Sequence, residues 1–225
     1  MLLAIRFKVE GSLRFLSHAE TVKVFQRACV RAGVRVQYSQ GFNPRPRLSL
    51  PLPRSVGVES DDELFCVRVA RDPLPAGDAP DERQATSDES RIKAALAGQL
   101  PEGFELLSVS VASAGTSFAP RSATYVLAVR REYLDEELKA TIERLLSSEH
   151  LPVRRTMDEG KTKFKNVDVR RFLKSIKLDD KSIMVECEIS PAGSVRVEEI
   201  LNLLGLDEGK LAAPIRRTNV QWQGE

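Results

Sequence analysis

The feature of this sequence that most constrains its fold is a succession of strand and helix patterns that occurs twice. In each half of the 225 residues, the hydrophobic pattern changes between strand and helix periods in the order strand, helix, strand, strand, helix, strand. This order is typical of a ferredoxin-like module, β-α-β-β-α-β. We therefore predict an α+β protein of two tandem ferredoxin-like modules with antiparallel sheets, at residues 1–115 and 122–225.

Local signals bound the elements of the first half. Apolar residues alternate with polar ones in the first predicted strand, at Leu3, Ile5, Phe7 and Val9. Residues 17–20 have the S-x-x-E form of a capping box, which predicts a helix that begins after Ser17 and ends near Gly33. The remaining predicted elements are a Pro-rich extended segment over 43–53, a strand over 64–69, a polar loop over 72–87, a short helix around 92–96 and a strand over 104–111.

The second half repeats this order after a break at residues 112–121, which is rich in Ala, Ser and Gly. This composition marks the break as the boundary between the modules. The predicted elements are a strand over 125–129, a helix over 134–145, an extended segment over 153–178 with a charged loop at 158–166, a strand over 183–189, a helix capped by Ser194 and ended by Gly205, and a strand over 215–220.

Cysteine usage and hydropathy argue against several classes of protein. The three cysteines, Cys29, Cys66 and Cys187, are far apart and form no C-x-x-C pair. This argues against a disulfide framework, a zinc site or an iron–sulfur cluster, so we predict no metal, no cofactor and a cytoplasmic location. The chain has no run of about 18 apolar residues that would span a membrane. Residues 1–11 alternate as a strand does, unlike a signal peptide.

Positive charge is concentrated in two windows, although the formal net charge is only +2. Residues 21–58 contain seven Lys or Arg and no acid, and residues 151–181 contain ten Lys or Arg against five acids. Such windows favour an anionic partner, and the alternative is that they are solvated faces without a partner.

The most distinctive segment is a Pro-rich loop at residues 37–47, QYSQGFNPRPR. Three residues are expected to shape it, namely Gly41, Asn43 and Pro44. A stiff loop loses little entropy on binding, so Arg45 and Arg47 are suited to grip phosphate or carboxylate oxygens. Tyr38 and Phe42 are candidates to stack on unpaired bases, and their alternative role is to fill the core.

Basic residues also line one face of the first predicted helix. Lys23, Arg27 and Arg31 recur every four residues and therefore share a face. With Arg35 and the loop arginines, they form a candidate RNA-binding surface. The alternative is an ordinary solvated helix face.

A second group of cations lies in the second half. Lys161, Lys163 and Lys165 alternate along a predicted extended segment, and Arg170 and Arg171 follow. Lys163, Lys165 and Arg170 are candidate phosphate contacts. The alternative is that the lysines protect an exposed edge strand from aggregation.

The chain has two histidines. His18 begins the first predicted helix, whose positive end disfavours a protonated imidazole, and a neutral imidazole can accept a proton. The alternative role of His18 is structural, within the helix cap. His150 follows a predicted helix and is expected to cap its carbonyls.

Several segments resemble a bacterial radical-SAM-linked domain family of unknown function. They are LRFLSH at 13–18, YSQGFNPRPR at 38–47, LPRSVGVES at 52–60 and NVDVR at 166–170. The resemblance implies a partner that is a cobalamin-binding radical-SAM protein, and a gene context that includes ribonuclease and ribosomal proteins. Arg45 stands where the family more often has histidine, which favours a charge role there. The chain lacks the three-cysteine motif of a radical-SAM enzyme.

These observations lead to one preferred hypothesis and two alternatives. The preferred hypothesis is a non-catalytic RNA- or ribonucleoprotein-binding accessory module that works with a radical-SAM protein. The first alternative is a metal-independent RNA endonuclease in which His18 deprotonates a 2′-hydroxyl. The second alternative is a protein–protein adaptor whose arginines meet an acidic partner.

Overall fold

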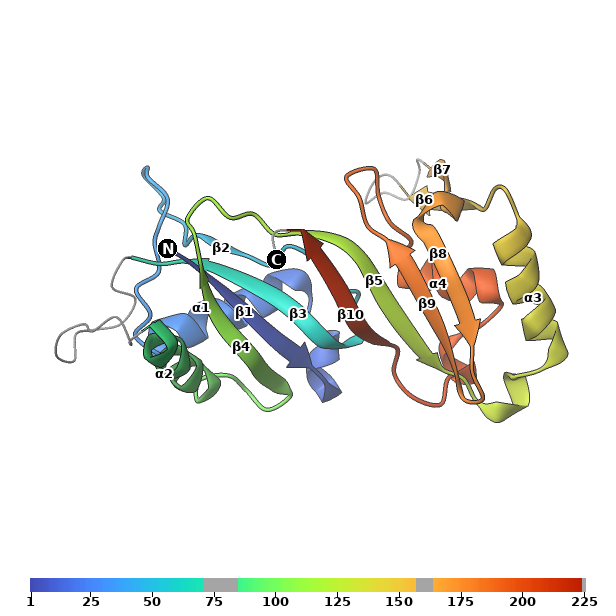
Figure 1. The fold of residues 1–225 in the computed structure, drawn as a ribbon, viewed down its shortest axis with the longest axis horizontal. Coiled ribbons are helices and arrows are strands. Elements are labelled where there is room, and N and C mark those ends of the chain that lie inside the picture. Colours follow the sequence, from blue (N-terminus) through green and yellow to red (C-terminus); the bar gives the residue numbers. More distant parts are fainter. Residues whose placement is uncertain (71–84, 157–163, 224–225) are drawn as a thin grey trace. The chain divides into compact units, whose positions relative to one another are not determined.

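A computed structural model describes residues 1–70, 85–156 and 164–223 of the chain (Figure 1). The chain divides into two compact units: unit 1 comprises Met1–Ala119 and the chain end from Gln223, and unit 2 comprises Pro120–Trp222. The fold is mixed α/β, with four α-helices in the described part and mostly antiparallel strands. No helix in that part is both long and apolar enough to span a bilayer.

Unit 1 has the predicted order of elements. They are β1 (Leu2–Val9), α1 (His18–Arg31), β2 (Leu48–Ser49), β3 (Glu59–Arg68), α2 (Ala85–Ala97) and β4 (Phe104–Ala112), with a 3-10 turn, η1 (Gly11–Phe15), before α1. Strand β1 lies between β3 and β4 and is antiparallel to both, and β2 pairs antiparallel with β3. The strand order within unit 1 is therefore β4-β1-β3-β2.

The core of unit 1 lies on one face of this sheet. Phe7 of β1 and Phe65 of β3 each pack on Phe25 of α1, with ring centroids 4.5 Å apart. Ile92 and Leu96 of α2 join the same cluster, and the two helices contact each other. The alternation along β1 thus places its apolar residues beneath both helices.

The predicted capping box of α1 is confirmed. The Ser17 hydroxyl accepts a hydrogen bond from the Glu20 backbone N–H, and the Glu20 carboxylate accepts one from the Ser17 N–H at 2.8 Å. Gly33 follows the helix with a φ of +71°, a conformation that glycine adopts without strain.

Unit 2 has a similar order with one added hairpin. Its elements are β5 (Ala119–Ala128), the 3-10 turn η3 (Arg131–Tyr133), α3 (Glu136–Ser147), β6 (Pro152–Thr156), β7 (Phe164–Asp168), η4 (Arg170–Phe172), β8 (Leu173–Leu178), β9 (Ser182–Glu188), α4 (Val197–Leu204), η5 (Glu208–Lys210) and β10 (Arg216–Gln223). The strand order within unit 2 is β10-β5-β9-β8. Strands β6 and β7 pair with each other in a separate antiparallel ribbon.

Unit 2 corrects several boundaries predicted from the sequence. The extended segment over 153–178 is divided into β6, β7 and β8, and residues 164–166 of the predicted charged loop belong to strand β7. The rest of that loop, residues 158–163, lies outside the described residues. Likewise, residues 72–84 of the predicted polar loop lie outside the described part, and α2 begins at Ala85.

The cap of α4 is also corrected. The N-cap is Arg196 and not Ser194. The Ser194 carbonyl instead accepts a hydrogen bond from Arg155 at 2.7 Å, and Glu199 accepts one from the Arg196 N–H at 2.8 Å. These two contacts explain why the helix begins after Arg196. Gly205, with a φ of +67°, ends the helix as predicted.

Candidate functional site

The Pro-rich segment 37–47 forms a hairpin, which we call the arginine hairpin. The Ser39 N–H donates to the Arg45 carbonyl and the Arg47 N–H donates to the Gln37 carbonyl, both at 2.8 Å. At its base, the Gln37 N–H donates to the Arg68 carbonyl at the end of β3. Figure 1 shows this segment as a blue loop that extends beyond the sheet of unit 1. The hairpin is therefore anchored at its base and projects at its tip.

The aromatic residues of the arginine hairpin lie on the surface. Phe42 is fully exposed and Tyr38 is 47% exposed, so neither fills the core. Gly41 precedes Phe42 with a φ of +125°, a region that L side chains rarely adopt. Arg45 and Arg47 are exposed on the returning arm. Chain direction at the tip thus depends on glycine, as the sequence indicates.

The basic residues of α1 also face outward. Lys23, Arg27 and Arg31, which we call the α1 basic face, are exposed, whereas Phe25 and Cys29 on the other side are buried. None of the three forms an ion pair within 4 Å with a described residue. Their charge is therefore available to a ligand.

Chain connectivity keeps the two basic groups within unit 1 close to each other. Gln37 is only six positions after Arg31, so the end of α1 and the base of the arginine hairpin lie within roughly 20 Å. Arg35, between them, is exposed, and its carbonyl accepts a hydrogen bond from the Ala70 N–H at 3.0 Å.

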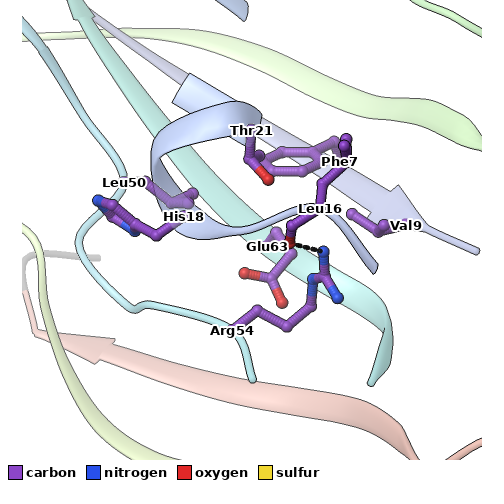
Figure 2. A pocket seen from close by; sticks show the side chains of 8 residues that line it. All are labelled: Phe7, Val9, Leu16, His18, Thr21, Leu50, Arg54 and Glu63. Carbon is purple, nitrogen blue, oxygen red and sulfur yellow. Dashed lines mark hydrogen bonds between the residues drawn. The ribbon is translucent and has the colours of Figure 1, made fainter. Parts of the chain in front are cut away.

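One cation of the acid-free window is structural. Arg54 is only 8% exposed, and its guanidinium donates to the carbonyls of Arg14, Leu13 and Val58. Figure 2 shows it beside the buried carboxylate of Glu63. Arg54 therefore holds the η1 turn against the segment before β3. Sequence reasoning missed this role because nothing local distinguishes Arg54 from an exposed arginine.

His18 lies at the rim of the same region. Its side chain is exposed, and Figure 2 shows its ring directed away from Arg54 and Glu63. It forms no hydrogen bond with a described residue. A catalytic base is normally oriented by a hydrogen bond to a third group, and no described residue forms such a bond with the His18 ring.

The candidate phosphate contacts of unit 2 differ in their environments. Lys165 is exposed on β7, whereas Lys161 and Lys163 lie outside the described residues. The Arg170 guanidinium donates to three carbonyls, those of Ser148, Leu173 and Leu146, at 2.9–3.0 Å. Arg170 therefore joins the end of α3 to the start of β8, and each nitrogen of its guanidinium donates a hydrogen bond within the protein.

His150 does not cap α3. Its Nδ1 lies 2.7 Å from the Asp168 carboxylate, which also accepts hydrogen bonds from the backbone N–H groups of Leu151 and Arg170. The Leu151 N–H contributes most, followed by His150 and the Arg170 N–H, and together they lower the pKa of Asp168 from 3.8 to about 2. Asp168 is thus the acceptor at the junction of α3, β6 and β7.

An Asp168→Asn substitution tests this assignment through pH. A depressed carboxyl pKa stabilises the fold at pH values above the unfolded pKa and loses this effect as pH falls to the folded pKa. We therefore expect Asn to destabilise unit 2 near pH 6, with a difference from the wild type that shrinks between pH 4 and pH 2. Urea unfolding at several pH values measures it. A difference that is constant across this window would contradict the assignment.

Comparison with known proteins places the chain in a family. A family model described as uncharacterized protein conserved in bacteria (DUF2344) matches residues 3–201. The chain belongs to this family. A search of curated proteins gave no match.

Among solved structures, the chain is similar to the small subunit of acetolactate synthase from Thermotoga maritima. The two are 9% identical, and the match covers 100% of this chain and 98% of that chain with a TM-score of 0.23. So low a TM-score gives no information about function.

Proposed function

We propose that this member of the DUF2344 family is a non-catalytic RNA-binding accessory protein, and that unit 1 contacts the RNA. The observation that carries the proposal is the arginine hairpin, which presents exposed arginines and exposed aromatic rings on one anchored loop. The α1 basic face supplies further cations at the base of this loop. The arginine hairpin and the α1 basic face would bind the same ligand, a single-stranded RNA segment with accessible phosphates and bases.

The two kinds of side chain on the hairpin have complementary roles. Arg45 and Arg47 present planar guanidinium groups that bind phosphate oxygens through two hydrogen bonds at once. Phe42 and Tyr38 offer ring faces on which unpaired bases stack. Phe42 is fully exposed at the loop tip, so both faces of its ring are accessible to an unpaired base.

The fold and the partner complete the proposal. Each unit is a ferredoxin-like module, supported by the order β4-β1-β3-β2 in unit 1 and the equivalent order β10-β5-β9-β8 in unit 2. The protein acts in the cytoplasm with a radical-SAM protein, for which it presents the RNA or ribonucleoprotein. The support for this partnership is the resemblance of the segments at 13–18, 38–47, 52–60 and 166–170.

Salt dependence of RNA binding tests the role of the hairpin. The full chain is titrated with a fluorescent single-stranded RNA at several salt concentrations. Each lost phosphate contact lowers the log–log salt slope by about 0.7, so Arg45→Ala with Arg47→Ala should lower it by roughly 1.4. The substituted arginines are exposed, so the melting temperature should change little.

A matched variant controls for net charge. Arg131→Ala with Arg144→Ala removes two exposed arginines of unit 2, and it should leave the slope close to that of the parent protein. RNA binding with an unchanged affinity and slope in the hairpin variant would remove the hairpin from the interface. Absence of RNA binding by the parent protein would overturn the proposed function.

A further inference from the structure

A second basic site lies in unit 2, in a groove beside the β6–β7 ribbon. The groove encloses about 480 Å³ and is lined by residues of β6, β7, η4 and the connection to α4, among them Arg155, Lys165, Asp168, Arg171, Ala192 and Arg196. We call it the unit 2 groove. This volume is within the usual range of small-ligand sites, about 300–1,000 Å³.

The walls of the unit 2 groove are held in place by polar contacts. Arg155 donates through Nε and Nη2 to the two carboxylate oxygens of Glu199, at 2.7 and 2.8 Å, and also to the Ser194 carbonyl. Ser190 and Gly193 exchange two backbone hydrogen bonds, which close the turn that carries Ala192. The site is thus preformed on both sides.

Three cations at the groove remain available. Lys165, Arg171 and Arg196 are exposed, and none forms an ion pair within 4 Å with a described residue. The Arg171 guanidinium lies over the Phe172 ring, 4.6 Å from its centroid. A contact with a ring face uses none of the hydrogen-bond donors of the guanidinium, so Arg171 keeps them for a ligand.

Asp168, which lines the groove, and Glu199, which pairs with the lining residue Arg155, both already accept hydrogen bonds. Glu199 accepts from Arg155 and from the Arg196 N–H. Asp168 accepts from the Leu151 and Arg170 N–H groups and contacts His150. Among the described residues that line the groove, the cations Lys165, Arg171 and Arg196 outnumber the one remaining carboxylate, Asp168, once Arg155 is counted with its partner Glu199. The described part of the groove is therefore positive.

We propose that the unit 2 groove binds a phosphate group, held by the N–H edges of Arg171 and Arg196 and by the Lys165 ammonium group. This site is independent of the surface proposed for unit 1. The phosphate belongs either to an RNA strand or to a small polyphosphate, and both present the same oxygen acceptors to arginine.

Two probes distinguish these sources in the full chain: inorganic pyrophosphate, and a five-nucleotide single-stranded RNA without a terminal phosphate. Calorimetry measures affinity, and the NMR signals of arginine Nε–H groups report which side chains are contacted. Arg171→Ala and Arg196→Ala should each weaken binding about tenfold, the effect of losing one charge-assisted hydrogen bond. Arg171→Lys should recover only part of this loss, because lysine lacks the planar guanidinium that binds two phosphate oxygens at once.

Two controls separate this site from other basic surfaces. Arg144→Ala removes an exposed arginine of α3 and should bind pyrophosphate as the parent protein does. Arg45→Ala with Arg47→Ala should leave pyrophosphate binding intact even if it abolishes RNA binding by unit 1. Pyrophosphate binding identifies a small-phosphate site, and groove-dependent binding of RNA alone identifies a strand. Saturation by neither probe, or equal binding by the Arg171→Ala and Arg196→Ala variants, would overturn the proposal.

Discussion

Glu199→Ala is expected to lower the free energy of unfolding by about 3 kcal/mol, because it leaves a nearly buried arginine without its counter-ion. The side chains of Arg155 and Glu199 are only 15% and 11% exposed. Burial alone raises the pKa of Glu199, but the hydrogen bonds from Arg155 and from the Arg196 N–H outweigh it and leave the pKa below its ordinary value. The substitution also removes the Glu199 contact that caps α4.

Chemical unfolding of matched variants measures this effect. Glu199→Gln keeps an acceptor for the Arg196 N–H and should be less destabilising than alanine. Arg155→Leu with Glu199→Leu removes both charges, and it should recover much of the stability lost by either single change, since apolar replacements of buried pairs are often neutral. An alanine variant as stable as the parent protein would show that the pair does not hold the β6–β7 ribbon to α4.

The second large effect is expected on RNA binding. Arg27→Glu with Arg31→Glu replaces two cations of the α1 basic face with anions at exposed positions. Each lost charge-assisted contact costs about 1.5–3 kcal/mol, and each 1.4 kcal/mol is about a tenfold change, so affinity should fall by roughly 100-fold or more. Repulsion between the new carboxylates and RNA phosphates increases this loss. Fluorescence titration at constant salt measures it.

Two further variants identify the cause of this loss. Arg27→Gln with Arg31→Gln removes the charges without adding repulsion, and it should weaken binding less than the glutamates do. Arg131→Glu with Arg144→Glu makes the same change of net charge on unit 2 and should have a small effect. Glutamate in the last turn of α1 costs about 0.3–1 kcal/mol against the helix dipole, so circular dichroism must first show that the fold is intact. Equal losses in the two glutamate variants would indicate a dependence on net charge alone.

Sequence patterns predicted the elements of unit 1 more accurately than those of unit 2. In unit 1, the alternation of β1 and the Ser17–Glu20 capping box are local signals, and both are confirmed. In unit 2, the β6–β7 ribbon interrupts the repeat, and its strands carry exposed charged residues that hide the alternation. The predicted N-cap of α4, Ser194, was also wrong. Its carbonyl accepts a hydrogen bond from Arg155, a residue that is distant in the sequence.

Sequence patterns identified some residues of the candidate sites and missed the structural role of others. The residue types and spacing of the arginine hairpin and of the α1 basic face are enough to nominate them, since an acid-free window and a helical period are properties of the chain alone. Sequence reasoning could not separate Arg54 and Arg170 from their exposed neighbours. Both donate to backbone carbonyls that are brought to them by folding.

Local patterning was therefore sufficient for the order of strands and helices in unit 1, the helix ends at Ser17 and Gly205, and the concentration of positive charge. These properties depend on neighbours along the chain, through dihedral preferences and hydrophobic period. Only the tertiary structure decided which cations are free, because a guanidinium is engaged by carbonyls or carboxylates from remote segments. Arg155 and Glu199 are 44 residues apart, and their pairing, with the groove it supports, exists only after folding.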